Sequence, residues 1–252
     1  MKYLYYIYQI LFALPILLLA TIITATATIV GSALGFARFW AFWPAKIWSW
    51  LIIRILLLPV HIEGQENVDE QTSYVFVANH QGYFDIFLIY AFLGNTFRWM
   101  MKKSLRKIPL VGKACESGGQ IFVDKSGPKA IKRTYDKARE ILRGGVSVVV
   151  FPEGSRTFTG CMGYFKKGAF QLADELQLPV VPITINGPFD VLPRTAKVPL
   201  IHWHPLSIKF HKPIPPQGKG KEFELQTLEA AYEAVRNGLP TERQKYVQND
   251  DQ

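Results

Sequence analysis

Four polar blocks could carry chemistry, because each follows or interrupts a short apolar run rich in β-branched residues. In chain order they are Asn79-His80 with Asp85, Asp124-Lys125, "PEGSR" at 152–156, and Pro182 within "PVVPITI". Binding sites in α/β proteins commonly lie at the ends of such strands. Each block alone reads as an ordinary turn or a helix cap. Together they predict one polar site at an edge of a sheet.

His80 and Asp85 form the pair with the clearest chemistry. A neutral imidazole is a competent general base near pH 7, and a carboxylate bound to its other nitrogen orients the ring and stabilises the imidazolium. Five positions on a continuous helix would turn the two side chains about 140° apart. We therefore expect His80 in the loop before a helix and Asp85 in or near its first turn. For an isolated His–Asp pair, a solvated loop is the more common explanation.

The sequence offers no convincing serine nucleophile. The stretch "PEGSRT" lacks the G-x-S-x-G turn that exposes the serine of many hydrolases. Without such a nucleophile, His80 would activate a hydroxyl group of the substrate itself. Arg156, Lys125 and the cluster "KKSLRK" at 102–107 would supply charge and hydrogen-bond donors for a phosphate.

From His61 onward, apolar runs typical of strands alternate with segments typical of helices. The expected strands lie at 73–79, 119–124, 146–152, 179–185 and 206–211, and the expected helices at 86–93, 103–116, 127–143, 165–176 and 222–236. This alternation predicts an α/β fold in which helices flank a mixed sheet. Proline at position 182 normally confines a strand to a sheet edge or a bulge.

The first 58 residues differ from the rest in composition. They contain no Asp or Glu and only four basic residues, and the uncharged run at 3–36 exceeds the ~20 apolar residues that a bilayer-spanning helix needs. A signal peptide is the alternative, but the apolar run continues past its candidate cleavage site at Ala25-Thr26-Ala27. We divide the chain into a hydrophobic membrane-anchoring helical segment at 1–58, an α/β domain at 59–237 and a polar tail at 238–252.

A second apolar segment at 39–60 carries four tryptophans, which suit the membrane interface. Arg54 within it argues against a simple second span. We favour a helical hairpin that dips into one leaflet, with both ends on the cytoplasmic face, over a clean crossing. The net charge of +9 favours an anionic partner, and the apolar front indicates a membrane surface rather than nucleic acid. Cys115 and Cys161 have no metal-ligand spacing and are expected to be reduced thiols.

In these polar blocks the sequence resembles the glycerolipid acyltransferase family typified by 1-acylglycerol-3-phosphate acyltransferases. The family blocks are N-H-x-x-x-x-D, G-x-I-F-[IV]-[DE]-R, F-P-E-G-[ST]-R and V-P-[VI]. They appear in order as Asn79-His80…Asp85, "GQIFVDK" at 119–125, "FPEGSR" at 151–156 and Val181-Pro182-Ile183. The resemblance covers roughly residues 60–215. One block would be a weak signal, but four in order are specific.

The resemblance implies a role for each matching residue. His80 corresponds to the general base that deprotonates the acceptor hydroxyl, and Asp85 corresponds to its orienting partner. Lys125 stands where the family usually has arginine, so it keeps the charge but loses the bidentate fork. Pro182 corresponds to a block linked less firmly to donor binding or to the shape of the site. The block that corresponds to the acceptor-phosphate site comprises Glu153, Gly154, Ser155 and Arg156.

The resemblance therefore implies a membrane-bound acyltransferase. Such an enzyme moves a fatty acyl group from acyl-CoA or acyl-ACP to the free hydroxyl of 1-acyl-glycerol-3-phosphate (lysophosphatidic acid) and forms phosphatidic acid. Its partners would be the lysophospholipid, the thioester donor, the bilayer and an acyl carrier protein; no nucleic acid, cofactor or metal is expected, because a thioester is already activated. The alternatives are another acceptor, such as glycerol-3-phosphate, another lysophospholipid or an acylated amino-acid lipid, and a non-catalytic lipid-binding protein. A lipid hydrolase would need an internal nucleophile.

Overall fold

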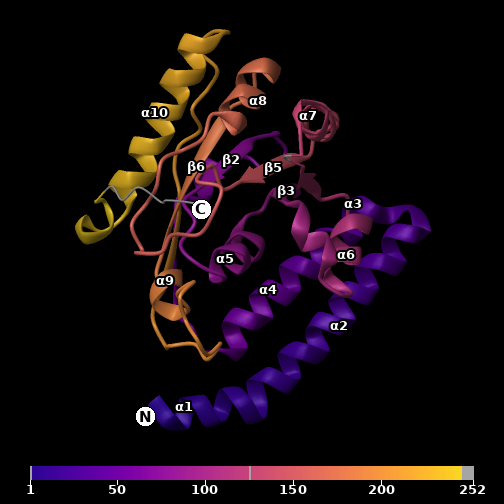
Figure 1. Ribbon diagram of the computed structural model, residues 1–252, viewed down its shortest axis with the longest axis vertical. Helices are drawn as coiled ribbons and strands as arrows, with labels where there is room; N and C mark the ends of the chain where they lie inside the picture. The colour runs from indigo at the N-terminus through magenta and orange to yellow at the C-terminus, as the bar shows by residue number, and fades with distance from the viewer. Residues whose placement is uncertain (1, 125, 246–252) are drawn as a thin grey trace.

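The central sheet has a parallel region whose strands end at a common edge. The computed structural model describes residues 2–124 and 126–245. In this part of the chain, seven strands form one sheet in the order β1-β7-β6-β2-β5-β3-β4 (Figure 1). Their bounds are β1 Val60–Glu63, β2 Val75–Ala78, β3 Phe97–Lys102, β4 Ile121–Val123, β5 Ser147–Val150, β6 Val180–Asn186 and β7 Leu206–Phe210. The strands from β6 to β4 run parallel and β7 and β1 run the opposite way, so the carboxyl ends of β6, β2, β5, β3 and β4 share one edge.

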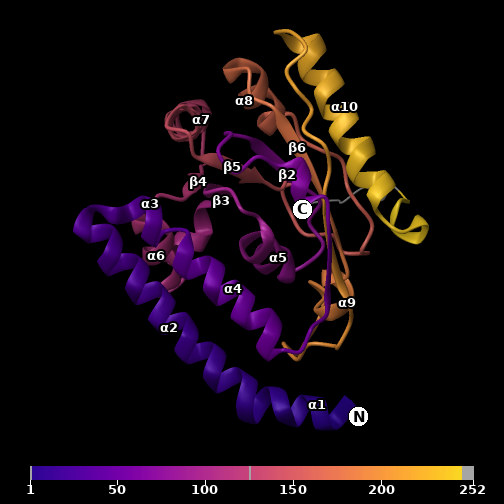
Figure 2. The same ribbon diagram turned by 180° about the vertical axis from the view of Figure 1, so that it is seen from behind.

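Helices cover both faces of this sheet. The larger ones are α4 Trp43–Ile55, α5 Phe84–Phe92, α6 Val111–Ser117, α7 Pro128–Arg143, α8 Gly168–Leu176 and α10 Lys221–Gly238, with the short α9 at Pro188–Val191. Along β2, Phe76 and Ala78 pack in the core with α4 and α5, whereas Val75 and Val77 pack in the core with α7, α8 and α10 (Figures 1 and 2). The α/β fold with a mixed sheet flanked by helices is confirmed.

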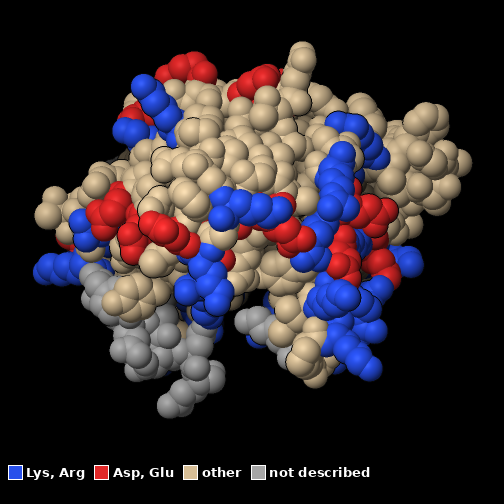
Figure 3. Space-filling view, turned by 90° about the horizontal axis from the view of Figure 1, so that it is seen from above, with Lys and Arg blue, Asp and Glu red and all other residues tan. Residues whose placement is uncertain are grey.

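The side of the molecule that carries α7, α8 and α10 has a mixed charge. Figure 3 looks onto this side and shows Lys and Arg side chains lying among Asp and Glu side chains. Several pairs are in contact, such as Arg139 with Asp136 at 2.6 Å and with Glu175 at 2.6 Å. This surface is therefore that of an ordinary water-exposed face.

The chain begins with a long apolar helical run that turns back on itself. It consists of α1 Lys2–Tyr8, a π-helical turn at Gln9–Ala13, α2 Leu14–Gly31, a second π-helical turn at Ser32–Phe36, and α3 Ala37–Trp40. Of the helices in the described part of the chain, this run, Lys2–Trp40, is long and apolar enough to cross a membrane. After Ala41 and Phe42, α4 returns alongside α2 and packs on α5 of the body (Figures 1 and 2). The apolar segment is thus joined to the α/β domain by packing as well as by the chain.

Polar side chains of the first helical turns hold this run against the body. The hydroxyl groups of Tyr5 and Tyr8 donate to the carbonyl oxygens of Leu56 and Ile55, at 2.6 and 2.7 Å, where α4 ends. The buried Gln9 amide bonds both backbone groups of Ile201, at 2.9 and 3.0 Å. These bonds satisfy groups that would otherwise lie unpaired in an apolar setting.

The expected helix at 103–116 is present only in its second half, and the third strand was not expected. The structure has a 3-10 turn at Lys103–Lys107 and then α6, because Pro109 cannot continue a helix and Leu110 has a φ of 60°. β3, with the sequence "FRWMMK", carries charged residues at two of its six positions. Those charges hide the apolar pattern of a strand.

Pro182 was expected at a sheet edge or a bulge, and the structure shows a bulge in the facing chain. Ile183 pairs with Phe210 and Val180 bridges to Ile214, so one extra residue lies opposite Pro182. β6 lies between β2 and β7 in the interior of the sheet. The Pro182 carbonyl oxygen accepts a hydrogen bond from the His211 N–H at 3.0 Å, just beyond the last residue of β7. Pro182, which has no N–H, therefore lies where the regular pairing of β6 with β7 is already interrupted.

Candidate active site

The His80–Asp85 pair lies at the carboxyl end of β2, at the shared edge of the parallel strands. β2 ends at Ala78, His80 lies in the following loop, and Asp85 is the second residue of α5. The His80 Nδ1 atom is 2.6 Å from Asp85 Oδ2; the Asp85 side chain is fully buried and the His80 side chain is 15% exposed. The Gly82 N–H also donates to Asp85 Oδ2, at 2.9 Å. A proton on Nδ1 donated to Asp85 leaves Nε2 free to accept another proton.

The loop after β5 holds the backbone of His80 in place. β5 neighbours β2 in the sheet, so "FPEGSR" begins next to the His80 loop. Glu153 accepts the His80 N–H on Oε1 at 2.7 Å and the Gly163 N–H on Oε2 at 2.8 Å. The Thr157 N–H donates to the His80 carbonyl oxygen at 2.9 Å. Both backbone groups of the histidine are therefore bound to one neighbouring loop.

Aromatic rings lie against the imidazole. The Phe151 ring stacks on the His80 ring with centroids 3.9 Å apart and an interplanar angle of 5°. The Trp99 ring, from β3, lies against Phe151 at 5.2 Å. This stack limits the rotation of the imidazole, and a restricted ring loses less entropy when it is aligned for proton transfer.

Arg156 stands at the end of the same loop with unused hydrogen-bonding capacity. Gly154 turns the chain with a φ of 85°, which favours glycine, and Ser155 and Arg156 follow. The Arg156 guanidinium carbon lies 3.7 Å from the centroid of the Tyr83 ring, in the His80–Asp85 loop. Its Nη1 atom is buried and has no hydrogen-bond partner among the described residues. A planar donor held over an aromatic face suits the recognition of a phosphate or carboxylate.

Two buried carboxyl groups flank His80. Burial raises the pKa of Asp85 above its ordinary value, while the hydrogen bonds from His80 and Gly82 oppose that shift. Burial also raises the pKa of Glu153 to about 8; the N–H groups of Gly163 and His80 lower it, and the negative charge on Asp85 adds to the rise. Perturbed carboxyl groups in one place are typical of functional sites.

The structure brings His80, Asp85, Glu153, Gly154 and Arg156 together, whereas Pro182 lies apart from them. Pro182 pairs with Val77, well before the carboxyl end of β6, and lies on the face covered by α10. The block after β4 is three strand spacings from β2, roughly 14 Å. There Asp124 binds Lys103 at 2.7 Å, which lowers the pKa of Asp124 to about 2. Lys125 lies outside the described residues.

Sequence reasoning missed three contacts of the site. Phe151 and Tyr83 lie inside the recognised blocks, but their spacing alone does not reveal a stack on His80 or on Arg156. Arg194 follows α9, and its Nη1 donates to the Arg156 carbonyl oxygen at 2.9 Å, while its guanidinium carbon lies 4.0 Å from the centroid of the Phe158 ring. The sequence signal that could have revealed Arg194 is its position as a basic residue in the loop after β6, because β6 ends at the same edge of the sheet as β2 and β5.

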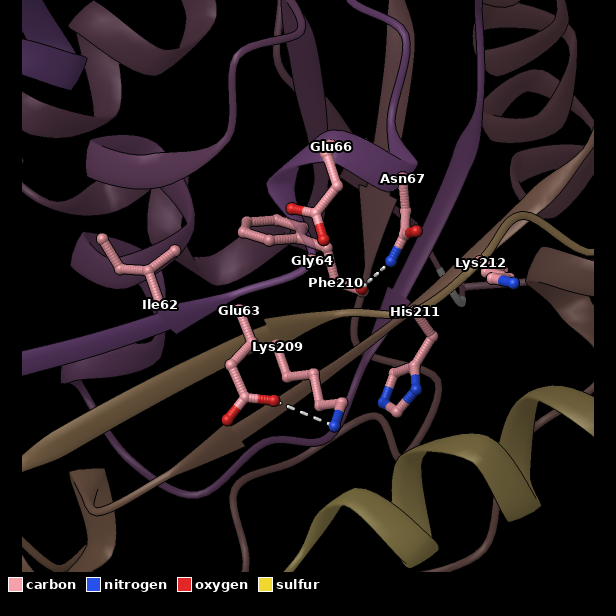
Figure 4. Close-up of a pocket in the computed structure, with 9 residues that line it drawn as sticks. All are labelled: Ile62, Glu63, Gly64, Glu66, Asn67, Lys209, Phe210, His211 and Lys212. Atoms are coloured by element: carbon pink, nitrogen blue, oxygen red, sulfur yellow. Dashed lines mark hydrogen bonds and ion pairs between the residues drawn. The ribbon is translucent and has the colours of Figure 1, made fainter.

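A separate surface depression lies away from these residues. It is formed where β1 and β7 end, level with the amino-terminal half of β6 (Figure 4). Glu63 and Lys209 form an ion pair there at 2.9 Å, and the Asn67 amide donates to the Phe210 carbonyl oxygen at 2.9 Å.

Among residues 2–124 and 126–245, no group of three or more His, Cys, Asp or Glu side chains could hold a metal ion.

Replacing Arg156 with alanine should mainly weaken the binding of an anionic substrate. Loss of a charge-assisted hydrogen bond costs on the order of 1.5–3 kcal/mol, which is roughly a 10- to 100-fold rise in KM for the substrate that carries the phosphate. Steady-state kinetics of Arg156→Ala would measure KM for each of the two substrates that the resemblance implies, the phosphorylated acceptor and the acyl donor. Arg156→Lys keeps the charge and should lose less. An equal change in both KM values would contradict the assignment of Arg156 to phosphate binding.

Glu153 should make the stability of the protein depend on pH. The folded protein holds the Glu153 proton more tightly than the unfolded chain, so this stabilisation is present below about pH 4.5 and is lost as the pH rises through about 8. Glutamine at position 153 cannot ionise, so the free energy of unfolding of Glu153→Gln lacks this pH dependence. The difference in the free energy of unfolding between the parent protein and the variant should therefore fall by up to ~1.4 kcal/mol per pH unit between pH 6 and 8. Melting temperatures across that range test this, with Glu229→Gln on exposed α10 as the control. A constant difference between parent and variant would contradict the assignment.

Comparison with known proteins places the chain in a family. A family model described as Acyltransferase matches residues 59–186. The chain is 32% identical over 216 residues to an uncharacterized acyltransferase of Schizosaccharomyces pombe, covering 84% of this chain and 77% of the relative. It is 34% identical over 171 residues to a chloroplastic 1-acyl-sn-glycerol-3-phosphate acyltransferase of Arabidopsis thaliana, covering 68% of this chain and 47% of the relative. The chain spans about half the length of the plant relatives it matches.

A solved structure shares the fold as well. The crystal structure of the 1-acyl-sn-glycerophosphate (LPA) acyltransferase PlsC from Thermotoga maritima aligns with a TM-score of 0.71 at 29% sequence identity. The alignment covers 89% of this chain and 93% of that protein. The chain belongs to the acyltransferase family.

Proposed function

We propose that this protein is an O-acyltransferase that moves a fatty acyl group from a thioester to the free hydroxyl of lysophosphatidic acid and forms phosphatidic acid. The observation that carries the proposal is the 2.6 Å contact between His80 Nδ1 and the buried Asp85 carboxylate, beside the unpartnered Nη1 of Arg156. A general base, His80, and a cation, Arg156, at one edge of the sheet suit a substrate that carries both a hydroxyl group and a phosphate. Relatives from Arabidopsis thaliana, Brassica napus and Homo sapiens are named 1-acyl-sn-glycerol-3-phosphate acyltransferases, which supports this choice of acceptor.

The reaction needs one proton to move twice. The acceptor hydroxyl gives its proton to His80 Nε2 while its oxygen attacks the thioester carbonyl carbon. The Asp85 carboxylate stabilises the imidazolium that forms. The tetrahedral intermediate then collapses, the carbon–sulfur bond breaks, and the leaving thiolate takes the proton from the imidazolium. The products are the new ester and a free thiol, and the protein returns to its starting state.

The phosphate of the acceptor would be held by Arg156, which is stacked on Tyr83. Glu153 is unsuited to that task because it is a carboxyl group, is buried, and has both oxygens bound by backbone N–H groups. We therefore assign Glu153 to positioning His80 rather than to binding the acceptor. Lys102 lies at the carboxyl end of β3, next to β5, and is a second candidate cation for the same phosphate.

The donor would be acyl-CoA or acyl-ACP, approaching from the cytoplasmic face of the membrane. The helical run Lys2–Trp40 would hold the enzyme on the bilayer, and α4 returns beside α2, as a hairpin dipping into one leaflet would require. Cys115 and Cys161 are unpaired, which fits a reducing compartment. The carrier on the thioester makes no difference to the chemistry at His80.

A panel of acceptors tests the proposed function. Purified protein in detergent would receive a labelled acyl thioester with lysophosphatidic acid, glycerol-3-phosphate, lysophosphatidylcholine or an acylated amino-acid lipid. We expect the highest kcat/KM for lysophosphatidic acid, with labelled phosphatidic acid as the product. Equal transfer to lysophosphatidylcholine would contradict an acceptor site built around a terminal phosphate.

A further inference from the structure

The segment at 102–110, which leads from the end of β3 to α6, exposes several apolar side chains to solvent. Every residue from 102 to 110 is exposed. Leu105 is 38% exposed, Ile108 44% and Leu110 37%. One exposed leucine or isoleucine is unremarkable, but three within six residues form a patch that prefers an apolar partner.

Basic residues alternate with these apolar ones. Residues 102–113 contain five Lys and Arg and no Asp or Glu. Two of the cations are paired with acidic side chains from outside the segment, Lys103 with Asp124 and Arg106 with Glu116. Lys107 has no ion pair among the described residues, and Lys113 reaches Glu116 only at 3.7 Å. A net positive charge therefore surrounds the exposed apolar side chains.

The segment lies beside the apolar helical run. α6 directly follows it and packs against α2 (Figures 1 and 2). The fit is close, because a Cβ on Gly118 at the end of α6 would lie 3.1 Å from the Ala41 Cβ. The segment itself folds tightly onto α6, since a Cβ on Gly112 would lie 2.2 Å from the Arg106 carbonyl oxygen. The patch at 102–110 is thus held rigidly next to the helices that meet the membrane.

We propose that the segment 102–110 is a second membrane contact, which places Leu105, Ile108 and Leu110 in the interface of an anionic bilayer. Lys107 and Lys113 then lie at the level of the lipid phosphates, where each cation strengthens binding. An acidic carrier protein would also suit the charges, but the position beside α2 favours lipid. The inference rests on the membrane-bound part of the proposed function and is independent of which acceptor is used.

This contact would orient the active site. β3 ends at the same sheet edge as β2 and β5, so the segment and the His80 loop leave the sheet on the same side. Lys2–Trp40 alone holds the protein on the membrane but leaves it free to tilt. A second contact restricts that tilt and keeps the His80 edge facing the lipids.

Depth measurements on the full-length protein test the contact directly. Cys115→Ala and Cys161→Ser remove the native thiols, and an environment-sensitive fluorophore is placed at Ile108→Cys. The matched control is Ile131→Cys on α7, 41% exposed and on the mixed-charge side. In vesicles with brominated acyl chains, we expect strong quenching at 108 and none above background at 131. Equal quenching at the two positions would overturn the proposal, whatever the acceptor assay shows.

The anionic component is tested by varying the lipid headgroup. Quenching at 108 should rise with the fraction of phosphatidylglycerol in phosphatidylcholine vesicles. Lys107→Gln with Lys113→Gln should lower the ratio of docked to undocked segment about fivefold per lysine, whereas the control pair Lys129→Gln with Lys132→Gln on α7 should leave it unchanged. The same response in both pairs would overturn the charge assignment. The fluorophore at position 108 can also be exposed to iodide, a soluble quencher, with and without acyl carrier protein. If acyl carrier protein protects the fluorophore and brominated lipid does not quench it, the patch binds a protein and the proposal is overturned.

Discussion

Replacing His80 with alanine should reduce acyl transfer by about 10²–10⁴-fold, the usual contribution of a general base. The effect should fall on kcat, because the imidazole accepts the proton of the acceptor hydroxyl during the chemical step. The backbone of residue 80 is held by Glu153 and Thr157 rather than by the ring, so the loop should keep its shape. Loss of the hydrogen bond to the buried Asp85 should cost about 1–3 kcal/mol of stability. The measurement is steady-state transfer from a labelled thioester to lysophosphatidic acid.

A folding control makes that result specific. His80→Ala should stay in the membrane fraction and unfold in one cooperative transition, at a lower temperature than the parent protein because the hydrogen bond to Asp85 is lost. His80→Gln fills more of the space on Phe151 and should be as inactive as the alanine variant. Turnover near the parent level in either variant would exclude His80 as the base.

Asp85→Asn should produce the second large loss, on the order of 10²–10⁴-fold in kcat. Asp85 Oδ2 accepts from both His80 Nδ1 and the Gly82 N–H, so the amide oxygen of asparagine would occupy this position and keep both bonds. The variant therefore removes the charge while preserving the orientation of His80. The loss would measure the electrostatic stabilisation of the imidazolium.

Asp136→Asn on the exposed surface of α7 is the matched control and should retain full activity. A normal kcat in Asp85→Asn would show that the carboxylate only orients the ring. A large rise in KM for the acceptor, with kcat unchanged, would instead place Asp85 in substrate binding.

The local part of the site could be predicted from the sequence. His80 and Asp85 are five residues apart, and the geometry of a loop that leads into a helix decides whether they meet. The contact between Glu153 and the His80 N–H could not be predicted in the same way. It depends on β5 lying next to β2, although the two strands are separated along the chain by β3, β4 and the three α-helices α5, α6 and α7. Strand order arises from long-range packing, which a single sequence does not reveal.

The errors in the fold have similar causes. β3 was missed because Arg98 gives a polar character to a strand that is buried. Arg98 is 7% exposed, and its guanidinium donates to the carbonyl oxygens of Phe97 and Ala37, an arrangement that requires α3 to lie nearby. Pro182 was expected at an edge or a bulge, and only the pairing of β6 with the chain after β7 shows that it lies at a bulge. In both places, a neighbouring element decides the outcome.

The central claim is that His80 activates the acceptor hydroxyl directly, without an acylated enzyme. The most direct measurement is the release of free thiol from the acyl thioester, followed with a thiol reagent, with and without lysophosphatidic acid. The account predicts release only when the acceptor is present, one thiol for each phosphatidic acid formed, and no burst. A burst of thiol equal to the enzyme concentration in the absence of acceptor would contradict it, because it would reveal an acyl group held on the protein.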